Sequence, residues 1–411
     1  MKEIIKNILR FFLNLTTVLL SKVLRYLPRR ADLWLFGATG GFRDNPKYLY
    51  YEVLEKHPEI NAVWVALGQK EYMALKNQGL PVVKQSSLKG MYYAIRAGVY
   101  IVDHSTPVIS RMLWGGTYYV NLWHGSSVKR VRWQNPDFYV REYGLKDASE
   151  MRTSFWFKMQ TYPIMFQKID LLLAPSSIQL REFFAPMMNI PEENCVVGVY
   201  PRSRLMIEGK EAALDFIVKY ESQETLNFVI SLAKYDKTYI YMPTWRNDGG
   251  NFIEQAGIDW QRLNDIMKEK NELFILKLHP FTELDIDSVA KYSNIMLYPK
   301  DSDVYTVLPF IDCLITDYSS IYTDFLMMNK EIILFVFDYE DYVKKSYELS
   351  EYDKYFVGKK TYTFNQLLQT ITSEEDCHVP KEDYNRLMEF FWDNNRHNID
   401  IVEEIKNRIG I

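Results

Sequence analysis

The sequence predicts an α/β protein built from two doubly wound domains, each with a parallel sheet. Two observations lead to this fold class. Short apolar runs alternate with segments of helical periodicity along most of the chain, as they do in strand–helix–strand units. In addition, the chain has 411 residues, which is more than one ordinary hydrophobic core holds. We therefore expect an N-terminal helix at 1–30, domains at 31–220 and 221–380, and a C-terminal helix at 381–411.

Composition and charge limit the classes of function. The net charge is −4, which argues against a general nucleic-acid-binding protein. This average hides an asymmetry, because residues 1–30 carry seven lysines and arginines against one acidic residue, a net charge of +6. The three cysteines are far apart and odd in number, so they form neither a disulfide framework nor a zinc-binding pattern. They indicate a reducing compartment.

Residues 4–27 are predicted to form an amphipathic helix. Apolar side chains recur at helical spacing at Ile4, Ile8, Phe12, Leu15, Leu19, Val23 and Leu27. The uncharged stretch, Phe11 to Ser21, is shorter than the ~20 residues that a membrane span needs, and no small-residue cleavage site follows it. The basic flanks favour a helix that lies on an anionic membrane surface. The alternative is a helix packed on the protein's own core.

The first domain begins after this helix. Its strands are expected at 33–36, 62–66, 81–83, 100–102, 118–122, 171–174 and 196–199, and its helices at 46–54, 71–78 and 88–97. Three strand ends carry glycine or polar residues, at Gly37–Gly41, Asp103–His104 and Trp123–Gly125. Ligands of such sheets bind beyond the carboxyl ends of the strands, so His104 and His124 lie where a site is expected.

Residues 129–168 of this domain mix basic and aromatic side chains. Such a segment could cover the site or touch lipid headgroups. It could equally be an ordinary amphipathic helical hairpin.

The second domain repeats the alternating pattern. Its strands are expected at 239–242, 273–278, 295–297, 313–315 and 332–336, and its helices at 258–268 and 304–310. The helical tail at 382–409 follows this domain. Polar residues again follow strand ends, at Thr244–Arg246, Lys277–His279 and Thr316–Ser320.

The most informative stretch is Ile311–Phe325. A short apolar run turns polar at Thr316–Asp317 and continues into a serine-rich helix start at Ser319–Ser320. The first N–H groups of a helix lack internal partners and lie at the positive end of the helix dipole, so a phosphate can bind there. The alternative is that Asp317 or Ser319 simply caps the helix.

Histidines follow strands in both halves of the chain: His104 and His124 in the first, and His279 in the second. A lone histidine is more often structural than catalytic. One histidine from each half could, however, deprotonate an acceptor hydroxyl and stabilise a phosphoryl group. Arg246 could bind a phosphate through its fork of donors, or it could form a surface salt bridge. The order of these polar strand ends along the chain suggests a nucleotide-activated donor in the C-terminal half and an acceptor in the N-terminal half.

Other chemistries fit less well. The chain has neither a Walker-type Gly-x-x-x-x-Gly-Lys loop nor a Gly-x-Ser-x-Gly elbow. No group of histidine, cysteine and carboxylate residues has metal-ligand spacing, so we expect no metal and no other cofactor. Gly37–Gly41 follows a strand but lacks the full dinucleotide-binding fingerprint.

Four ordered motifs resemble those of the CDP-glycerol:poly(glycerophosphate) glycerophosphotransferase family, which makes teichoic acids and related capsules. The family typically shows Trp-His-Gly-Thr-Pro-Leu-Lys, Pro-Thr-Trp-Arg, Arg/Lys-x-His-Pro, and Thr-Asp-Tyr-Ser-Ser followed by Asp. The matching residues here are Trp123–Lys129, Pro243–Arg246, Lys277–Pro280 and Thr316–Ser320 with Asp324, and Asp44–Lys47 and Pro201–Arg202 also resemble family positions. The resemblance covers residues 33–395.

This chain departs from the family pattern at two places. Ser126–Ser127 replaces the usual Thr-Pro, and Ser203–Arg204 stands where an Asn-Asp pair is common. Both departures bear on the identity of the acceptor more than on the type of reaction.

The resemblance implies a GT-B-like fold of two facing Rossmann-like domains, attached peripherally to the cytoplasmic side of the cell membrane. It implies transfer of a polyol phosphate, with glycerol phosphate expected first, from CDP-glycerol or CDP-ribitol and release of CMP. The acceptor would be a hydroxyl of a lipid-linked glycan or polyol phosphate. The alternatives are a GT-B glycosyltransferase that uses a nucleotide-sugar and a non-catalytic scaffold of envelope assembly.

The resemblance also implies roles for residues. His124 resembles the general base that acts on the acceptor hydroxyl, and His279 is the second expected catalytic residue, beside the donor diphosphate. The expected donor-binding residues are Arg246, Thr244, Lys277, Thr316, Asp317, Ser319 and Ser320, and the acceptor-binding or supporting residues are Gly125, Lys129, Asn45 and Arg202. Ser319 and Ser320 should hold charge rather than act as nucleophiles. Asp317 and Asp324 could instead be capping or structural residues.

Overall fold

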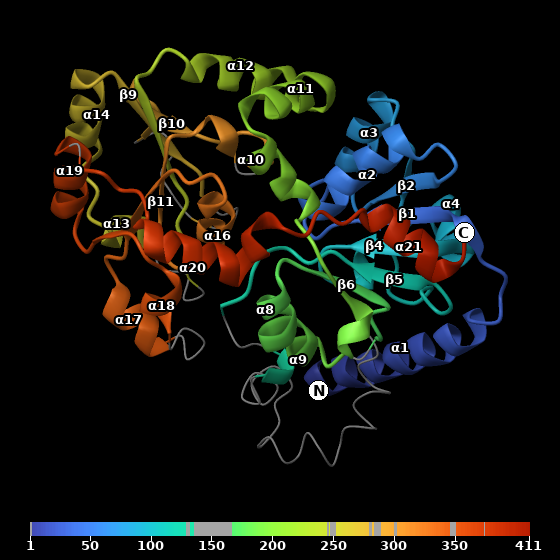
Figure 1. The fold of residues 1–411 in the computed structure, drawn as a ribbon. Coiled ribbons are helices and arrows are strands. Elements are labelled where there is room, and N and C mark those ends of the chain that lie inside the picture. The colour runs from blue at the N-terminus through green and yellow to red at the C-terminus, as the bar shows by residue number, and fades with distance from the viewer. Residues whose placement is uncertain are drawn as a thin grey trace. The chain divides into compact units, whose positions relative to one another are not determined.

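The computed structural model describes residues 2–128, 132–134, 167–244, 246, 252–278, 282, 289–299, 302–345, 351–373 and 375–411. The chain divides into two compact units (Figure 1). Unit 1 comprises Met1–His124, Arg130–Arg202 and Asn395–Ile411, and unit 2 comprises Gly125–Lys129 and Ser203–Asn394. Each unit is built around one parallel sheet, which confirms the predicted α/β class.

Unit 1 contains a seven-stranded sheet in the order β3-β2-β1-β4-β5-β6-β7. Its strands are β1 (Arg30–Gly37), β2 (Asn61–Ala66), β3 (Val82–Lys84), β4 (Ala97–Val102), β5 (Tyr118–Asn121), β6 (Leu171–Ala174) and β7 (Cys195–Val197). All neighbouring strands are parallel. The strands read as continuous apolar runs because both faces of a parallel sheet are covered, and Leu35, Phe36, Tyr100, Ile101 and Val120 are fully buried.

The helices of unit 1 pack around this sheet. They are α1 (Lys2–Leu24), α2 (Asp44–Lys56), α3 (Gln69–Asn77), α4 (Leu88–Arg96), α8 (Ser177–Gln179), α9 (Ala185–Met188) and α21 (Ile401–Ile409), with short turns η1 (Thr106–Val108), η2 (Arg132–Gln134), η3 (Leu180–Phe184), η4 (Glu192–Asn194) and η5 (Pro201–Ser203). Helix α21 comes from the end of the chain and is red in Figure 1, yet it lies among the elements of unit 1. There Lys406 forms an ion pair with Glu59 at 3.1 Å, and Arg408 donates to the Glu193 carbonyl at 2.7 Å.

Unit 2 contains a six-stranded parallel sheet in the order β10-β9-β8-β11-β12-β13. Its strands are β8 (Lys237–Tyr241), β9 (Glu272–Leu276), β10 (Ile295–Leu297), β11 (Cys313–Thr316), β12 (Glu331–Phe335) and β13 (Lys359–Thr361). Its helices are α10 (Arg204–Glu208), α11 (Lys210–Tyr220), α12 (Gln223–Leu232), α13 (Phe252–Gln255), α14 (Trp260–Glu269), α16 (Ile321–Leu326), α17 (Tyr339–Lys345), α18 (Tyr352–Tyr355), α19 (Phe364–Thr372) and α20 (Lys381–Trp392), with turns η6 (Leu308–Phe310) and η7 (Asp393–Asn395).

Local sequence explains where several helices begin. Ser222, Asp259, Thr363 and Asp400 each precede a helix, and the side-chain oxygen of each accepts a hydrogen bond from a backbone N–H of the first turn. Such caps satisfy donors that the helix itself cannot pair, typically for about 1 kcal/mol each. The helix starts in these regions are therefore set by single residues.

The strand orders place a candidate site in each unit. In both sheets the order reverses next to the first strand, between β1 and β4 in unit 1 and between β8 and β11 in unit 2. At such a reversal the connections leave in opposite directions, so the carboxyl ends of the two strands border a crevice that binds ligands in this class of fold. The polar motifs that follow β4, β5, β8 and β11 lie at these edges.

Helix α1 packs on unit 1 through a mixed face of Asn14, Thr17, Val18, Ser21 and Leu24. Thr17 and Ser21 are 0% and 5% exposed, whereas Leu9, Phe12 and Leu19 are 64%, 59% and 57% exposed. The predicted apolar stripe is therefore not the face that packs on the described part of the protein, although α1 does pack on unit 1, as the alternative interpretation expected. No helix among the described residues is long and apolar enough to cross a bilayer.

A glycine turn allows α1 to approach closely. A Cβ atom added to Gly115 would lie 1.9 Å from the Ser21 carbonyl oxygen, and one added to Gly116 would lie 2.8 Å from the Arg25 Cα. The Arg111 guanidinium also donates to the Asn14 side chain at 3.1 Å. These contacts fix the mixed face of α1 on unit 1.

Each predicted strand is present, but several predicted details differ. Strand β13 and helix α19 were not predicted, and the helix expected at 304–310 is only the turn η6. The prediction of a single C-terminal helix is wrong, because α20 ends at Trp392 and the chain then bends before α21. Asp393, Asn394 and Asn395 all have positive φ, which no helix continues through. The unit boundary falls at Arg202, whereas we expected it at residue 220.

Candidate active site

His124 lies just beyond the end of β5 and is exposed. Its Nδ1 is 3.2 Å from the carbonyl oxygen of Asp103, at the end of the neighbouring strand β4. A carbonyl only accepts, so this contact assigns the proton of the neutral imidazole to Nδ1 and the lone pair to Nε2. A neutral histidine in this tautomer can take a proton from a hydroxyl group.

Asn45 and Arg202 hold the backbone that carries His124. Asn45 is fully buried and donates to the carbonyls of Leu122 and Trp123, at 3.3 and 2.9 Å. Its Oδ1 accepts from the backbone N–H of Arg202 at 3.2 Å. The Arg202 guanidinium in turn donates to the His124 carbonyl at 2.9 Å. The structure thus brings together three residues that we expected in the acceptor site.

The Arg202 side chain is itself neutralised. It is 2% exposed and forms an ion pair with Asp44 at 2.6 Å. Asp44 has a φ of +60°, which an aspartate tolerates better than most residues. A buried guanidinium that is paired with a carboxylate orients that partner's loop strongly, because separating the two leaves an uncompensated charge.

The turn after β5 is strained. Trp123 has a φ of +53°, which costs a bulky side chain of order 1–2 kcal/mol, and Gly125 has a φ of +151°. The fully buried Asn121 supports the turn by accepting from the Trp123 N–H at 2.9 Å. Strain of this kind is retained where the surrounding contacts fix a functional geometry.

Asp103 is a further residue of this site, and it was not among the expected site residues. Its carboxylate accepts from the backbone N–H of Thr39 at 2.9 and 3.0 Å, which ties the glycine loop after β1 to β4. Burial and the nearby Asp44 carboxylate raise its pKa to about 6, although the hydrogen bonds from Thr39 oppose the shift. Asn121 was not among the expected site residues either. An amide side chain inside an otherwise apolar strand could have indicated its role.

In unit 2, Asp317 joins the ends of β8 and β11. It is fully buried, and its carboxylate accepts from the Thr244 N–H at 2.8 Å and the Thr244 hydroxyl at 2.7 Å. It also accepts from the Tyr318 N–H at 2.5 Å and from Arg246 at 2.9 Å. Thr316, also fully buried, donates to the Met242 carbonyl at 2.7 Å. These contacts give Asp317 and Thr316 a structural role, and donor binding by either residue stays a prediction.

Arg246 is buried rather than exposed as a surface salt bridge. It donates to Asp317 and, at 2.8 and 3.1 Å, to Asp338 beyond the end of β12. Burial alone lowers the pKa of Arg246, but the two carboxylates raise it above its ordinary value. The guanidinium carbon also lies 5.1 and 4.7 Å from the ring centroids of Tyr318 and Tyr342. These contacts give Arg246 a positioning role, and direct donor binding stays a prediction.

The remaining expected donor residues lie near this network. Ser319 is half-buried and Ser320 is exposed, at the start of α16, a helix of six residues. Lys277 follows β9, with its ammonium 5.8 Å from the Tyr298 ring centroid. Asp324 accepts from the Tyr305 hydroxyl at 2.8 Å. His279 and Lys129 lie outside the described residues, as does most of the basic and aromatic segment 129–168.

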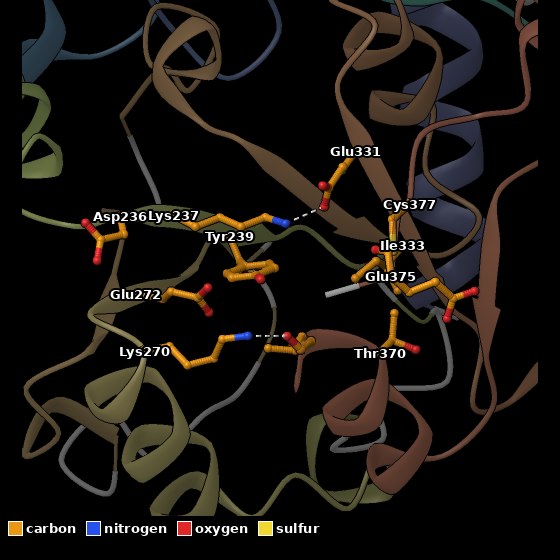
Figure 2. A pocket seen from close by; sticks show the side chains of 11 residues that line it. Asp236, Lys237, Tyr239, Lys270, Glu272, Glu331, Ile333, Thr370, Glu375 and Cys377 are labelled. Carbon is orange, nitrogen blue, oxygen red and sulfur yellow. Dashed lines mark hydrogen bonds and ion pairs between the residues drawn. The ribbon is translucent and has the colours of Figure 1, made fainter. Parts of the chain in front are cut away.

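A cavity of about 270 Å³ lies at the opposite, amino end of the unit 2 sheet. Figure 2 shows its lining, in which Lys237 and Glu331 from the first residues of β8 and β12 form an ion pair at 2.6 Å. Among the described residues, one group could hold a metal ion, and it includes this Glu331 with Asp376 and His378. Both features lie away from the strand ends where the expected site residues gather.

The comparisons with known proteins agree with the motifs. Residues 19–398 match the model of the family described as CDP-Glycerol:Poly(glycerophosphate) glycerophosphotransferase. The teichoic acid poly(glycerol phosphate) polymerase of Bacillus subtilis is 23% identical over 333 residues, 78% of this chain and 40% of that protein. The teichoic acid glycerol-phosphate transferase of Staphylococcus aureus is 24% identical over 349 residues, 83% of this chain and 82% of that protein.

Coverage differs among these relatives. The chain spans 34–41% of the length of three curated polymerases that it matches, so it corresponds to a part of them. A solved structure of the wall teichoic acid polymerase TagF superposes with a TM-score of 0.71 at 20% identity, and the match covers 100% of this chain and 97% of that one. That likeness shows a common fold. With the family model matching most of its length, the chain belongs to the CDP-glycerol:poly(glycerophosphate) glycerophosphotransferase family.

Proposed function

We propose that this protein transfers a polyol phosphate, glycerol phosphate first, from a CDP-polyol to a hydroxyl of a membrane-linked glycan or teichoic acid precursor. The relatives named as glycerol-phosphate transferase and polymerase support the reaction class. The observation that carries the proposal is the setting of His124, whose exposed imidazole has its Nδ1 on the Asp103 carbonyl.

In the proposed reaction, His124 Nε2 takes the proton of the acceptor hydroxyl. The acceptor oxygen attacks the phosphorus that bears the polyol, the bond from that phosphorus to the bridging oxygen breaks, and CMP leaves. The Asp103 carbonyl stabilises the imidazolium that forms, because it accepts a hydrogen bond from the Nδ1–H group in both the neutral and the charged ring. Asn45 and Arg202 keep the ring in place through the backbone.

We assign the donor diphosphate to the strand ends of unit 2. Ser319, Ser320 and Lys277 would bind its oxygens there, together with His279. Phosphoryl transfer relies mainly on positioning and on stabilising charge that spreads over the phosphoryl oxygens. The buried pair of Arg246 and Asp317 contributes by fixing the loops after β8 and β11, so that these donors do not have to reorganise during the reaction.

We further propose that α1 attaches the protein to the cytoplasmic side of the cell membrane. Its exposed apolar face would enter the headgroup region, and the exposed Lys22 and Arg25 would contact anionic lipids. Burying one such leucine or phenylalanine contributes about 1.5–3 kcal/mol. The triple variant Leu9→Ser, Phe12→Ser, Leu19→Ser should therefore fail to sediment with phosphatidylglycerol-containing vesicles. Leu88→Ser, at an 83% exposed site on α4, is the control and should still bind.

The decisive experiment is product analysis. Purified protein is incubated with CDP-glycerol or CDP-ribitol and a lipid-linked acceptor on vesicles, and CMP release and product mass are measured. We expect equal amounts of CMP and new phosphodiester. A glycosidic product with release of a nucleoside diphosphate from a nucleotide-sugar would establish the alternative glycosyltransferase, and no product from either CDP-polyol would contradict the proposal.

The role of His124 has its own test. His124→Ala should abolish transfer and leave CDP-polyol binding, measured by calorimetry, nearly intact. His57→Ala, which removes a histidine of the same unit at the end of α2, should change neither quantity. Lost donor binding with retained turnover at saturating donor would contradict the assignment of His124 as the base.

A further inference from the structure

Three aromatic rings of unit 1 stack together at the ends of β4 and β5. The ring centroids of His104 and His124 lie 5.6 Å apart, with an angle of 21° between the ring planes. The Trp123 ring lies 4.3 Å from that of His124 and 5.9 Å from that of His104. The reaction described above uses only His124, and it leaves His104 without a role.

The protein core fixes the position of His104. Its carbonyl accepts from the Asn121 amide at 3.0 Å and from the Tyr119 hydroxyl at 3.3 Å. Asn121 is fully buried and also binds the Trp123 N–H at 2.9 Å. One buried side chain therefore positions the ends of both strands, so the spacing of the two imidazoles does not depend on a surface loop.

Each imidazole has its Nδ1 beside an oxygen of the protein. For His124 this is the Asp103 carbonyl at 3.2 Å, and for His104 it is the Ser105 hydroxyl at 3.3 Å. In an imidazole, Nε2 lies on the opposite edge from Nδ1 and can donate or accept according to the tautomer. The two ring centroids lie 5.6 Å apart. At this spacing, hydrogen bonds of about 2.9 Å let each ring bind one of two hydroxyl groups on neighbouring carbons. His104 is half-buried, which strengthens a polar contact relative to the open surface.

We propose that His104 determines acceptor specificity by binding the hydroxyl next to the attacked one on the terminal polyol unit. The inference rests on the proposed function, because it takes His124 as the base at the attacked hydroxyl. The acceptor class is therefore a vicinal diol, as at the end of a glycerol or ribitol chain. His104 moves no proton in this assignment, and its contribution is to orient the acceptor.

The kinetic test removes the nitrogen atoms but keeps the ring. His104→Phe should raise the acceptor KM about tenfold, the loss of one hydrogen bond to a half-buried group, with kcat and the CDP-glycerol KM within about twofold. An acceptor ending in propanediol phosphate, which lacks the second hydroxyl, should raise the wild-type KM by the same factor and the variant KM no further. His57→Phe is the control and should behave as wild type. An acceptor KM that is unchanged in His104→Phe would overturn the proposal. So would a propanediol-ended acceptor that raises the KM of the variant by the same factor as the KM of wild type.

A second measurement is independent of turnover and of the phenylalanine packing. Protein with ¹⁵N-labelled histidine, six residues in the chain, is titrated with glycerol 3-phosphate and followed by NMR. We expect the imidazole signals of both His104 and His124 to shift, and those of His57 to stay. If both respond but no transfer occurs, the diol site stands and the proposed reaction fails. If transfer occurs and only His124 responds, the assignment of His104 is wrong.

Discussion

Replacing Arg246 by methionine should destabilise unit 2 more than any surface substitution. The methionine side chain fills similar volume but leaves Asp317, 0% exposed, without its cationic partner. Asp338 loses two hydrogen bonds from the guanidinium at the same time. Breaking a buried ion pair by removing one partner costs about 3–5 kcal/mol, which is a large share of the roughly 5–15 kcal/mol that stabilises a typical domain.

The size of the loss follows from which carboxylate remains uncompensated. Asp338→Asn removes one of the two partners of Arg246 and leaves the pair with Asp317 intact, so it should cost less than Arg246→Met. Arg246→Met leaves two carboxylates, Asp317 and Asp338, without their cation. Adding Asp338→Asn removes the charge of one of them. The double variant should therefore be more stable than the sum of the two single effects predicts, by about 1–2 kcal/mol.

Urea unfolding followed by circular dichroism gives the free energies, and calorimetry with CDP-glycerol gives donor binding. Arg262→Met is the matched control, because Arg262 is exposed on α14 and makes one hydrogen bond to Asn365. It should change the free energy of unfolding by less than about 0.5 kcal/mol. If Arg246→Met unfolds like wild type and loses only donor binding, the side chain acts as a phosphate ligand and the positioning argument is refuted.

Three further predictions concern unit 1. Asn121→Leu removes hydrogen bonds to the ends of both β4 and β5, so urea unfolding should show a loss of about 2–4 kcal/mol and the transfer assay a lower kcat. Because its pKa of about 6 is above the ordinary 3.8, Asp103 stabilises the fold only while it is protonated. The free energy of unfolding of wild type should thus fall by about 2 kcal/mol relative to Asp103→Asn between pH 4 and pH 7, and equal pH profiles would contradict the shift. Gly115→Val should detach α1, since even a Cβ clashes with the Ser21 backbone, and limited proteolysis should then remove α1 faster than from wild type.

The sheets could be predicted from sequence because their strands are buried on both faces. Apolar runs such as Leu171–Ala174 need no tertiary information to be recognised, and this strand has the expected bounds. Strand β13 escaped notice because Lys359–Thr361 is short and polar, and only its pairing with β12 makes it a strand. The bend after α20 left a signal, since Asp393–Asn395 consists of residues that tolerate positive φ, but the apolar pattern on both sides suggested one helix.

The site could be predicted only as a set of strand ends. Topology brings such ends together, which pointed to His124, whereas Asn45 and Arg202 were expected only from the family resemblance. The pairing of Arg246 could not be foreseen, because its partner Asp338 lies 92 residues away and binds it only through the packing of β12 beside β11. The bond between Arg202 and Asp44 spans 158 residues for the same reason. Sequence pattern locates polar groups, while tertiary packing decides whether they bind a ligand or each other.

The return of the chain from unit 2 to unit 1 affects how the protein can be synthesised. Unit 1 contains Asn395–Ile411, and the Val199 N–H bonds to the His397 carbonyl at 3.4 Å within that unit. Ribosomes add about 5–20 residues per second, so the segment that completes unit 1 follows Arg202 by roughly 10–40 s. Once Asn394 has been added, unit 2 has all its residues, whereas unit 1 still lacks Asn395–Ile411. The later unit in the sequence can therefore fold first, and the nascent first unit is the one that needs protection from aggregation.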